Sequence, residues 1–360
     1  MFEGLFSTTI WLNVTSVFAI LYAIYLCGKS DDKLIKGSSI NFPSLLVMML
    51  TTLYIGTRPI TSYADTNLYT MMFNLVQSGV WSELPGIATE PFWNFVEQIC
   101  IELTDASGWL LVIAIFYVLG MGIAAYRWLP KHTFIALVFL VTAFSFWGYA
   151  TNGIRNGMAT SIAMLGLTFF NRTKKELIIG YGLLILGVST HKSVLLTVVT
   201  ATAALFLTNT KTNITFWLCC IVLGLIFQEQ FKSLFAGLID DHRMVAYLSA
   251  EVDKSLFSQT GFRWDFLLYS SLPIFIGRYA IFNQKLTDKT YAFLLHTYIF
   301  SNSFWVLINT AAYSNRFAYL SWFLYPIVLV YPFCKFKFIN NQSVILGLLL
   351  IGMTAFTYFI

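Results

Sequence analysis

Four basic residues of this chain stand at the ends of apolar segments, where a charge is costly unless it snorkels to the interface or is used. They are Arg58 in T-R-P-I, Arg155 in G-I-R-N-G, Lys192 in T-H-K-S and Arg316 in S-N-R-F. A guanidinium stays charged and binds pairs of phosphate oxygens with its planar fork. If these segment ends converge, they form a basic pocket for a lipid phosphate or pyrophosphate. For each residue alone, snorkelling or a salt bridge to a nearby acid is the competing interpretation.

Two carboxylates and one histidine lie near the same segment ends. Asp65 in Y-A-D-T-N and Glu90 in A-T-E-P-F are candidates to take a proton from an acceptor hydroxyl, which needs an oxygen base within hydrogen-bond reach. Each has a structural alternative, because Asp65 could cap the helix that follows it and Glu90 could be a favourable charge at a helix N-terminus. His191 could donate to a phosphate oxygen, act as a base, or be structural. We expect Glu97 on the solvated surface.

Aromatic side chains near these residues could stack on sugars or hydrogen-bond to them. The candidates are Tyr63, Tyr69, Trp93 and Tyr313. Aromatic residues make up 18% of the chain, so plain packing is the alternative for each. No clustered spacing of histidine, cysteine and carboxylate indicates a metal site, and no Walker loop or dinucleotide fingerprint indicates a nucleotide site. We therefore expect no metal, no cofactor and no nucleic-acid partner.

The elements that must position these residues are membrane helices. Hydrophobic residues make up 58% of the 360 residues and charged residues only 11%, whereas a soluble domain carries about 25% charge. Apolar runs recur along the whole chain, which indicates an all-α polytopic integral membrane protein with about twelve spans, within a range of about ten to thirteen. The expected segments are 8–27, 43–57, 109–126, 133–150, 158–170, 177–189, 193–207, 214–227, 266–282, 291–309, 317–333 and 343–360.

The distribution of basic residues orients these segments. One set of loops holds thirteen lysines and arginines against four acids, and the positive-inside rule puts it in the cytoplasm. Both termini and the four cations described above then lie outside. Two external loops are long, about 58–108 and 228–265, and apolar residues at helical spacing predict amphipathic helices in them. No linker or internal repeat divides the chain, so one integrated domain, 1–360, is the simplest interpretation.

Five short motifs, taken in order, resemble those of a known family. They are R-P-I-T-S-Y-A-D-T-N-L-Y, T-E-P-F-W-N-F, G-I-R-N-G-M-A, H-K-S-V-L-L and N-R-F-A-Y, and the resemblance covers about 45–330. The chain resembles the EpsG-like family of Wzy-type bacterial polysaccharide polymerases, which make O-antigen, capsule and exopolysaccharide. The arginine motif of that family continues as I-R-Q, where this chain has Ile154, Arg155 and Asn156.

This resemblance implies an enzyme of the outer face of the bacterial inner membrane. Such an enzyme takes a growing glycan from undecaprenyl pyrophosphate and joins it to the next lipid-linked repeat unit. It has GT-C-like architecture and needs neither nucleotide sugar nor metal. A flippase and a chain-length regulator are possible partners, and the sequence leaves open whether the enzyme works alone or with them. A pyrophosphate leaving group gains charge as the glycosidic bond breaks, so fixed cations stabilise its transition state. The cations assigned to it are Arg58, Arg155 and Arg316, supported by Lys192 and His191, while Asp65 or Glu90 serves as the base.

Two other functions fit the same residues. A transporter or flippase of lipid-linked oligosaccharide also needs a basic, aromatic-lined pocket, although transporters tend to place charge near the membrane midplane and to show repeats. An O-antigen ligase uses the same donor and differs only in its acceptor. The cations on one face and the order of the motifs favour the polymerase.

Overall fold

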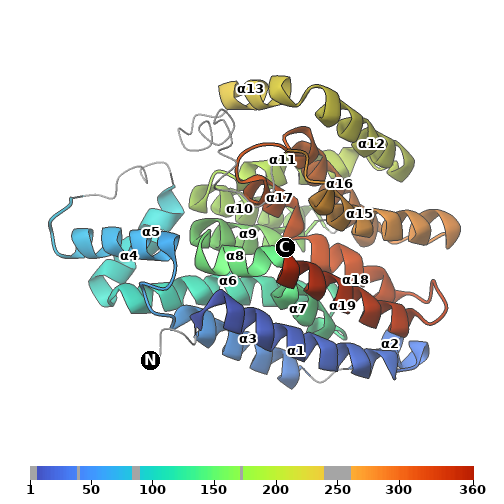
Figure 1. Cartoon of the computed structure of the whole chain (residues 1–360), viewed down its shortest axis with the longest axis horizontal. Coiled ribbons are helices and arrows are strands. Elements are labelled where there is room, and N and C mark those ends of the chain that lie inside the picture. Colours follow the sequence, from blue (N-terminus) through green and yellow to red (C-terminus); the bar gives the residue numbers. More distant parts are fainter. Residues whose placement is uncertain (1–5, 39–40, 83–89, 171–172, 239–260) are drawn as a thin grey trace. The chain divides into compact units, whose positions relative to one another are not determined.

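The fold is helical throughout the part of the chain that can be described (Figure 1). The computed structural model describes residues 6–38, 41–82, 90–170, 173–238 and 261–360. Within these ranges there are helices and connecting turns and no β-strand. The predicted all-α class is confirmed for these residues, because every predicted apolar segment coincides with one helix or with two consecutive helices.

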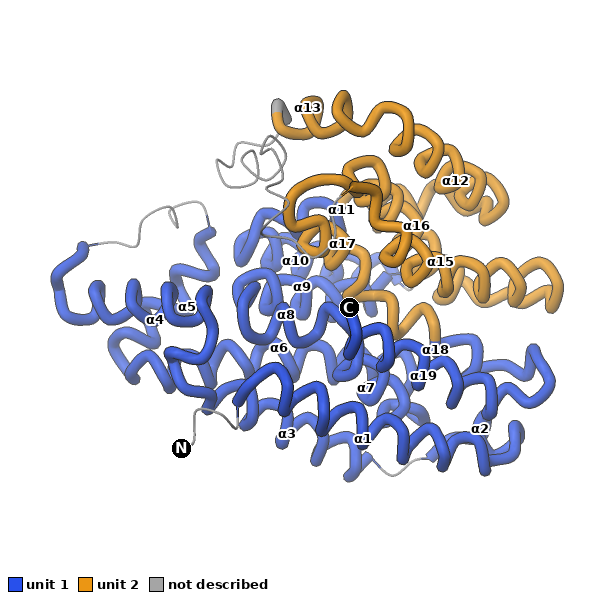
Figure 2. Tube along the Cα trace, viewed as in Figure 1, with its two compact units in different colours: residues 1–198, 330–360 blue, residues 199–329 orange. Residues whose placement is uncertain are grey.

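The chain divides into two compact units (Figure 2). Unit 1 holds residues 1–198 and 330–360, and unit 2 holds residues 199–329. Two helices, α11 (Val194–Phe206) and α18 (Tyr325–Lys335), contain the boundaries between them. The prediction that 1–360 forms one integrated membrane domain stays a prediction.

Unit 1 is built around a long central helix, α6 (Ala106–Trp128). Helices α3 and α9 pack along it, α10 packs along α9, and α1 lies beside the C-terminal helix α19. In Figure 1, α6 runs beneath α8 and α9. The remaining helices of this unit are α1 (Thr8–Cys27), α2 (Asp31–Lys36), α3 (Phe42–Gly56), α4 (Ala64–Gln77), α5 (Pro91–Leu103), α7 (Thr133–Thr142), α8 (Phe144–Thr151), α9 (Ile154–Leu167), α10 (Lys174–Thr190) and α19 (Gln342–Phe359).

Unit 2 is organised around α16 (Lys289–Leu307), which packs against α12 and α17. Polar side chains buried between these helices form hydrogen bonds with one another. Trp217 Nε1 donates to Asn302 Oδ1 at 2.9 Å, and Asn302 Nδ2 donates to Ser321 Oγ at 3.1 Å. Such bonds keep polar groups tolerable inside an apolar bundle. The other elements of this unit are α12 (Thr210–Ile226), α13 (Gln228–Leu238), α15 (Trp264–Arg278), η2 (Tyr279–Asn283) and α17 (Ser314–Trp322).

Several helices are long and apolar enough to cross a membrane. Four segments among the described residues qualify outright, namely Thr8–Cys27, Ala106–Trp128, Ser314–Lys335 and Gln342–Phe359. The count rises to six if two bent pairs are single broken spans, one of which is α7 with α8, bent by 71°. The chain is therefore a helical membrane protein with four to six candidate spans. The predicted twelve spans and the GT-C likeness are not confirmed.

The two predicted external loops differ in how much of them can be described. The first, 58–108, contains α4 and α5. The second, 228–265, begins with the helix α13 (Gln228–Leu238). That this helix lies amphipathically on the outer membrane surface stays a prediction. The predicted continuation into 239–260 lies outside the described residues.

Candidate active site

The centre of the candidate site is a buried ion pair between Arg155 and Glu90. Arg155 Nη1 lies 2.8 Å from Glu90 Oε2, and the two side chains are only 6% and 8% exposed. Arg155 Nε donates to the Tyr69 hydroxyl at 3.2 Å, and its guanidinium carbon lies 5.1 Å from the centre of the Tyr69 ring. His191 Nε2 lies 3.8 Å from the second carboxylate oxygen, Glu90 Oε1. Four candidates from four separate motifs thus meet in unit 1.

Three members of this cluster, Glu90, Arg155 and His191, sit at or near a helix end. Glu90 precedes α5 as its N-cap residue, with Pro91 opening the helix, and its side chain makes no capping hydrogen bond. Glu90 thus carries its charge at the N-terminus of α5, as its structural alternative predicts, and its carboxylate also faces Arg155. Arg155 is in the first turn of α9, and His191 is the C-cap residue of α10. Because α9 packs along α10, these two ends are brought together.

A glycine in the first turn of α9 allows that helix to begin close to α8. A Cβ atom at Gly157 would lie 2.6 Å from the backbone oxygen of Tyr149. Any larger residue would push the start of α9 away from the end of α8. Since Arg155 is only two residues earlier, the guanidinium would move with it.

The electrostatics of the pair explain why Arg155 tolerates its burial. Burial alone lowers the pKa of an arginine, but Tyr69 and Glu90 outweigh it and raise the pKa of Arg155. The first turn of a helix disfavours a cation and favours an anion. A negative partner is thus required at this position, and Glu90 is the one present. The contacts described for Arg155 engage Nη1 and Nε and leave Nη2 for another ligand.

A second carboxylate, Glu97, is buried beside this cluster. Its residue is only 2% exposed, so the predicted solvated position is wrong. The buried face of α5 consists of Trp93, Val96, Glu97 and Cys100, while Phe95 is exposed. Burial raises the pKa of Glu97 to about 7, and the positive charge of Arg155 opposes part of that rise. Glu97 can therefore change its charge near neutral pH, next to an arginine.

Arg58 occupies a different environment in the same unit. It follows α3 and is only 2% exposed. Nη1 donates to the backbone oxygen of Ile55 at 2.5 Å, and Nη2 donates to Thr66 Oγ1 at 3.0 Å. All its described partners are neutral, and Nε has none. Desolvation accordingly lowers the pKa of Arg58 to about 10.

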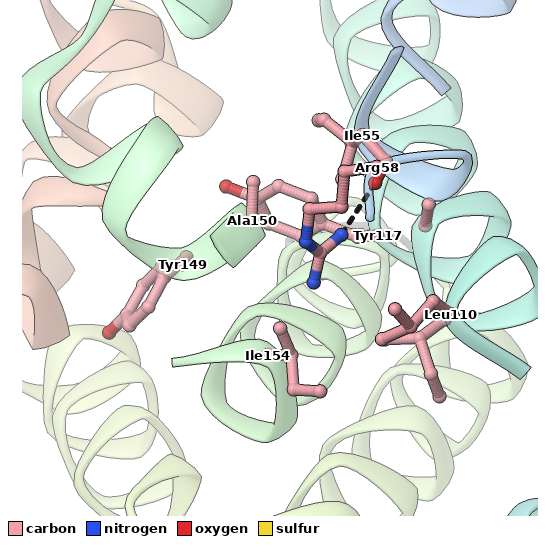
Figure 3. A pocket seen from close by; sticks show the side chains of 9 residues that line it. Ile55, Arg58, Leu110, Tyr117, Tyr149, Ala150 and Ile154 are labelled. Carbon is pink, nitrogen blue, oxygen red and sulfur yellow. Dashed lines mark hydrogen bonds between the residues drawn. The ribbon is translucent and has the colours of Figure 1, made fainter. Parts of the chain in front are cut away.

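A small cavity lies against Arg58 (Figure 3). Its volume is about 10 Å³, enough for a single water molecule. Figure 3 shows the guanidinium among lining residues that include Tyr117, Tyr149 and Ile154, with its hydrogen bond to Ile55. Ile154 is the residue immediately before Arg155, so the two arginines approach the same turn of α9.

Helix α4 connects the two arginines. Thr66 accepts from Arg58, and Tyr69, one helical turn later, accepts from Arg155. Residues three apart lie on one helical face. Thr66 in turn donates to the backbone oxygen of Thr151, at the end of α8. The same face of α4 thus holds both guanidinium groups against the segment that joins α8 and α9.

The comparison with known families bears on this arrangement. The family model described as the EpsG family matches residues 41–360 of the chain. The chain belongs to the EpsG family. This confirms the resemblance seen in the motifs, and it indicates a membrane polymerase of polysaccharide biosynthesis with glycosyltransferase-like activity. No curated protein and no solved structure matches the chain.

Three other predicted site residues of this EpsG-family chain, Tyr63, Asp65 and Trp93, belong to unit 1, as the cluster does. Asp65 is half-buried in the first turn of α4, four residues before Tyr69 and on the same face, and the N-cap position belongs to Tyr63. Tyr63 donates to the backbone oxygen of Phe6 at 2.6 Å. Trp93 is buried, with its ring 6.4 Å from that of Tyr69.

Three further predicted site residues, Lys192, Tyr313 and Arg316, are exposed. Lys192 is exposed beside His191. Arg316 is exposed in unit 2, where its guanidinium carbon lies 4.9 Å from the centre of the Tyr313 ring. Whether Arg316 and Tyr313 complete the unit 1 cluster stays a prediction. Across the described ranges, no group of three or more histidine, cysteine or acidic side chains could hold a metal ion.

Sequence reasoning missed three polar residues that the structure of this EpsG-family chain brings to the site. Glu97 could have been found, since Trp93, Val96, Glu97 and Cys100 follow the i, i+3, i+4, i+7 spacing of one helical face. Thr66 and Ser193 gave no such signal. A threonine or serine near a segment end is common, and the residue that joins each of these two to another helix lies far away in the sequence: Thr151 for Thr66 and Asn156 for Ser193.

Proposed function

We propose that this EpsG-family protein polymerises lipid-linked oligosaccharide repeat units. The donor is a glycan on undecaprenyl pyrophosphate, the acceptor is the next lipid-linked unit, and the reaction takes place at the outer face of the bacterial inner membrane. The observation that carries the proposal is the buried cluster of Arg155, Glu90 and His191, built on apolar helices in a chain of this family.

The two buried arginines suit a pyrophosphate leaving group. As the bond between the sugar C1 and the phosphate oxygen breaks, negative charge grows on that oxygen, and fixed cations stabilise the transition state more than the ground state. Arg155 has Nη2 left for the ligand, and Arg58 has only neutral partners among the described residues. Arg316 and Lys192 are proposed to add further positive charge. These side chains supply the charge that a divalent metal supplies in many sugar transferases.

The acceptor hydroxyl must lose a proton as the new bond forms. Glu90 and His191 both lie beside Arg155, and Asp65 is on the face of α4 that carries Tyr69. Tyr69 and Trp93, with Tyr63 and Tyr313, are proposed to contact the sugars. A flippase would deliver the repeat units to this face, and a chain-length regulator would act on the growing polymer.

The test is turnover by the purified protein with a lipid-linked repeat unit and no nucleotide sugar. We expect wild type to produce a glycan ladder and folded Arg155→Ala to lose at least about 100-fold in rate, the scale of removing one preorganised charge contact. The matched control is Arg278→Ala, which removes an exposed arginine at the end of α15. A wild type that makes no ladder but moves the lipid across a vesicle bilayer would replace the polymerase with a transporter.

A further inference from the structure

Glu97 is a second carboxyl group buried beside the candidate site, and it lacks the support that Glu90 has. It is only 2% exposed, and within the described ranges its Oε2 atom has no hydrogen-bond partner. Glu90, two helical turns earlier, is held by Arg155 at 2.8 Å. An ionised carboxylate without water or hydrogen bonds is costly, whereas the protonated group is much less so. The surroundings of Glu97 therefore favour its neutral form.

Glu97 nevertheless acts on the arginine of the candidate site. Burial raises the pKa of Glu97, and the charge of Arg155 opposes that rise. Glu97 is in turn one of the groups that raise the pKa of Arg155 against the effect of its burial. Aromatic side chains connect the two, since Tyr69 accepts a hydrogen bond from Arg155 and its ring lies 6.4 Å from that of Trp93. Trp93 is one helical turn before Glu97. Two carboxyl groups thus lie near one guanidinium.

The groups around Glu97 come from α5 itself and from the helices packed around it. The titratable ones are Glu90 and Cys100 on α5, Asp65 and Tyr69 on α4, Arg155 on α9, and His191 and the exposed Lys192 at the end of α10. The side chains that α6 adds to the buried cluster around Trp93 and Cys100 do not titrate; they are Ala106, Trp109, Leu110 and Ile113. Burial, and then Glu97, raises the pKa of the Cys100 thiol, so this group keeps its proton at neutral pH. Histidine ordinarily titrates near neutral pH, so a test must distinguish Glu97 from His191.

We propose that Glu97 is a positioning residue that must carry a proton for Arg155 to bind the pyrophosphate of the donor lipid. This inference rests on the proposed function. With Glu97 neutral, the Glu90 carboxylate balances Arg155, and an arriving anion meets no excess of negative charge. With Glu97 ionised, two carboxylates lie near one guanidinium and repel the anion, strongly so in a buried site. Coupling between two sites is reciprocal, so bound pyrophosphate holds the proton on Glu97. The proton comes from the solvent and returns to it when the lipid leaves.

The first measurement counts the protons taken up on binding and needs no turnover. The probe is a polyprenyl pyrophosphate esterified to one sugar, because both of its phosphates are then esters with fixed charge. Calorimetric titration in two buffers of different ionisation enthalpy gives the proton count. We expect wild type to take up close to one proton per lipid at about pH 8, and Glu97→Gln and Glu97→Leu to take up none. His191→Gln should keep the uptake, as should the exposed control Glu102→Gln. Undiminished uptake in Glu97→Gln would assign the proton to another group and overturn the inference.

The second measurement is the affinity for the same probe as a function of pH. Wild type and Glu102→Gln should bind about 10-fold less tightly at about pH 8 than at about pH 6, a common size for such coupling. Glu97→Gln should bind equally well at both, whereas a merely structural role would weaken binding at every pH. Parallel curves for Glu97→Gln and wild type would contradict the inference even if a glycan ladder forms. A coupled proton without a ladder would refute the polymerase alone, and a wild type that binds no probe at any pH would overturn both.

Discussion

Two buried arginines in unit 1 are stabilised in opposite ways. Arg155 is paired with the Glu90 carboxylate, and its pKa is raised. Arg58 has only a backbone carbonyl and a threonine hydroxyl as described partners, and desolvation lowers its pKa to about 10. The first cation is neutralised within the protein, whereas the second carries a charge that its described neighbours do not balance. An arriving anion would therefore share Arg155 with Glu90 but would be the first counter-charge for Arg58.

The largest expected effect on stability is at the paired arginine. Arg155→Met removes one partner of a buried pair and leaves the Glu90 carboxylate uncompensated. Breaking such a pair costs about 3–5 kcal/mol. The measurement is the free energy of unfolding in detergent. Arg155→Met combined with Glu90→Met should recover most of the loss, and equal instability of the single and double variants would show that the ion pair is not the cause.

The next effect concerns Glu97, the buried carboxyl beside the paired arginine. The pKa of Glu97 is about 7 in the folded protein against an ordinary 4.5. The folded state therefore holds this proton more tightly, and its contribution to stability is complete below about pH 4.5 and lost as the pH rises through about 7. A shift of this size corresponds to about 3 kcal/mol.

Glu97→Gln stays neutral at every pH, so it should remove this decline. We expect the variant to be more stable than wild type at pH 8 and similar to it at pH 4.5. The measurement is the melting temperature as a function of pH, with Glu102→Gln on the exposed side of the same helix as the matched control. Parallel curves for Glu97→Gln and wild type would mean that Glu97 is already ionised at neutral pH.

The smallest expected effect is at the unpaired arginine. Arg58→Met loses two hydrogen bonds but also removes the cost of a desolvated charge. The free energy of unfolding should therefore change by no more than about 1 kcal/mol. Its activity should nevertheless fall, because the proposed pyrophosphate site loses a cation. A destabilisation as large as that of Arg155→Met would abolish the contrast between the two regions.

The predictions from sequence succeeded where the signal was local. Apolar runs predicted the helices well, and α1 coincides with its predicted segment. The 71° bend between α7 and α8 was not predicted, because no proline or glycine stands in the run from Thr133 to Phe144. The predicted number of spans is not confirmed, since helices such as α3 and α11 are apolar but shorter than a candidate span.

The candidate site shows the same limit. The motifs identified Arg155, Glu90 and His191 individually, but the contact between Arg155 and Glu90 joins residues 65 apart. Only packing of α5, α9 and α10 creates it. Asp65 was a predicted site residue and Thr66 was not, yet the hydroxyl that accepts a hydrogen bond from Arg58 is that of Thr66. Helical geometry decides which of two adjacent residues faces inward, and short polar motifs do not record it.

The shortness of the helices around the site has a consequence for the surrounding lipid. Helix α3 has 15 residues and α11 has 13, which corresponds to about 20 Å of helix. The hydrocarbon layer of a bilayer is about 30 Å thick. Lipids must compress beside elements that are too short for them. We therefore expect hydrophobic mismatch to thin the membrane beside these two helices, next to Arg58 and His191, and to lower phosphate head groups toward the site, so that a lipid substrate would travel less far to react.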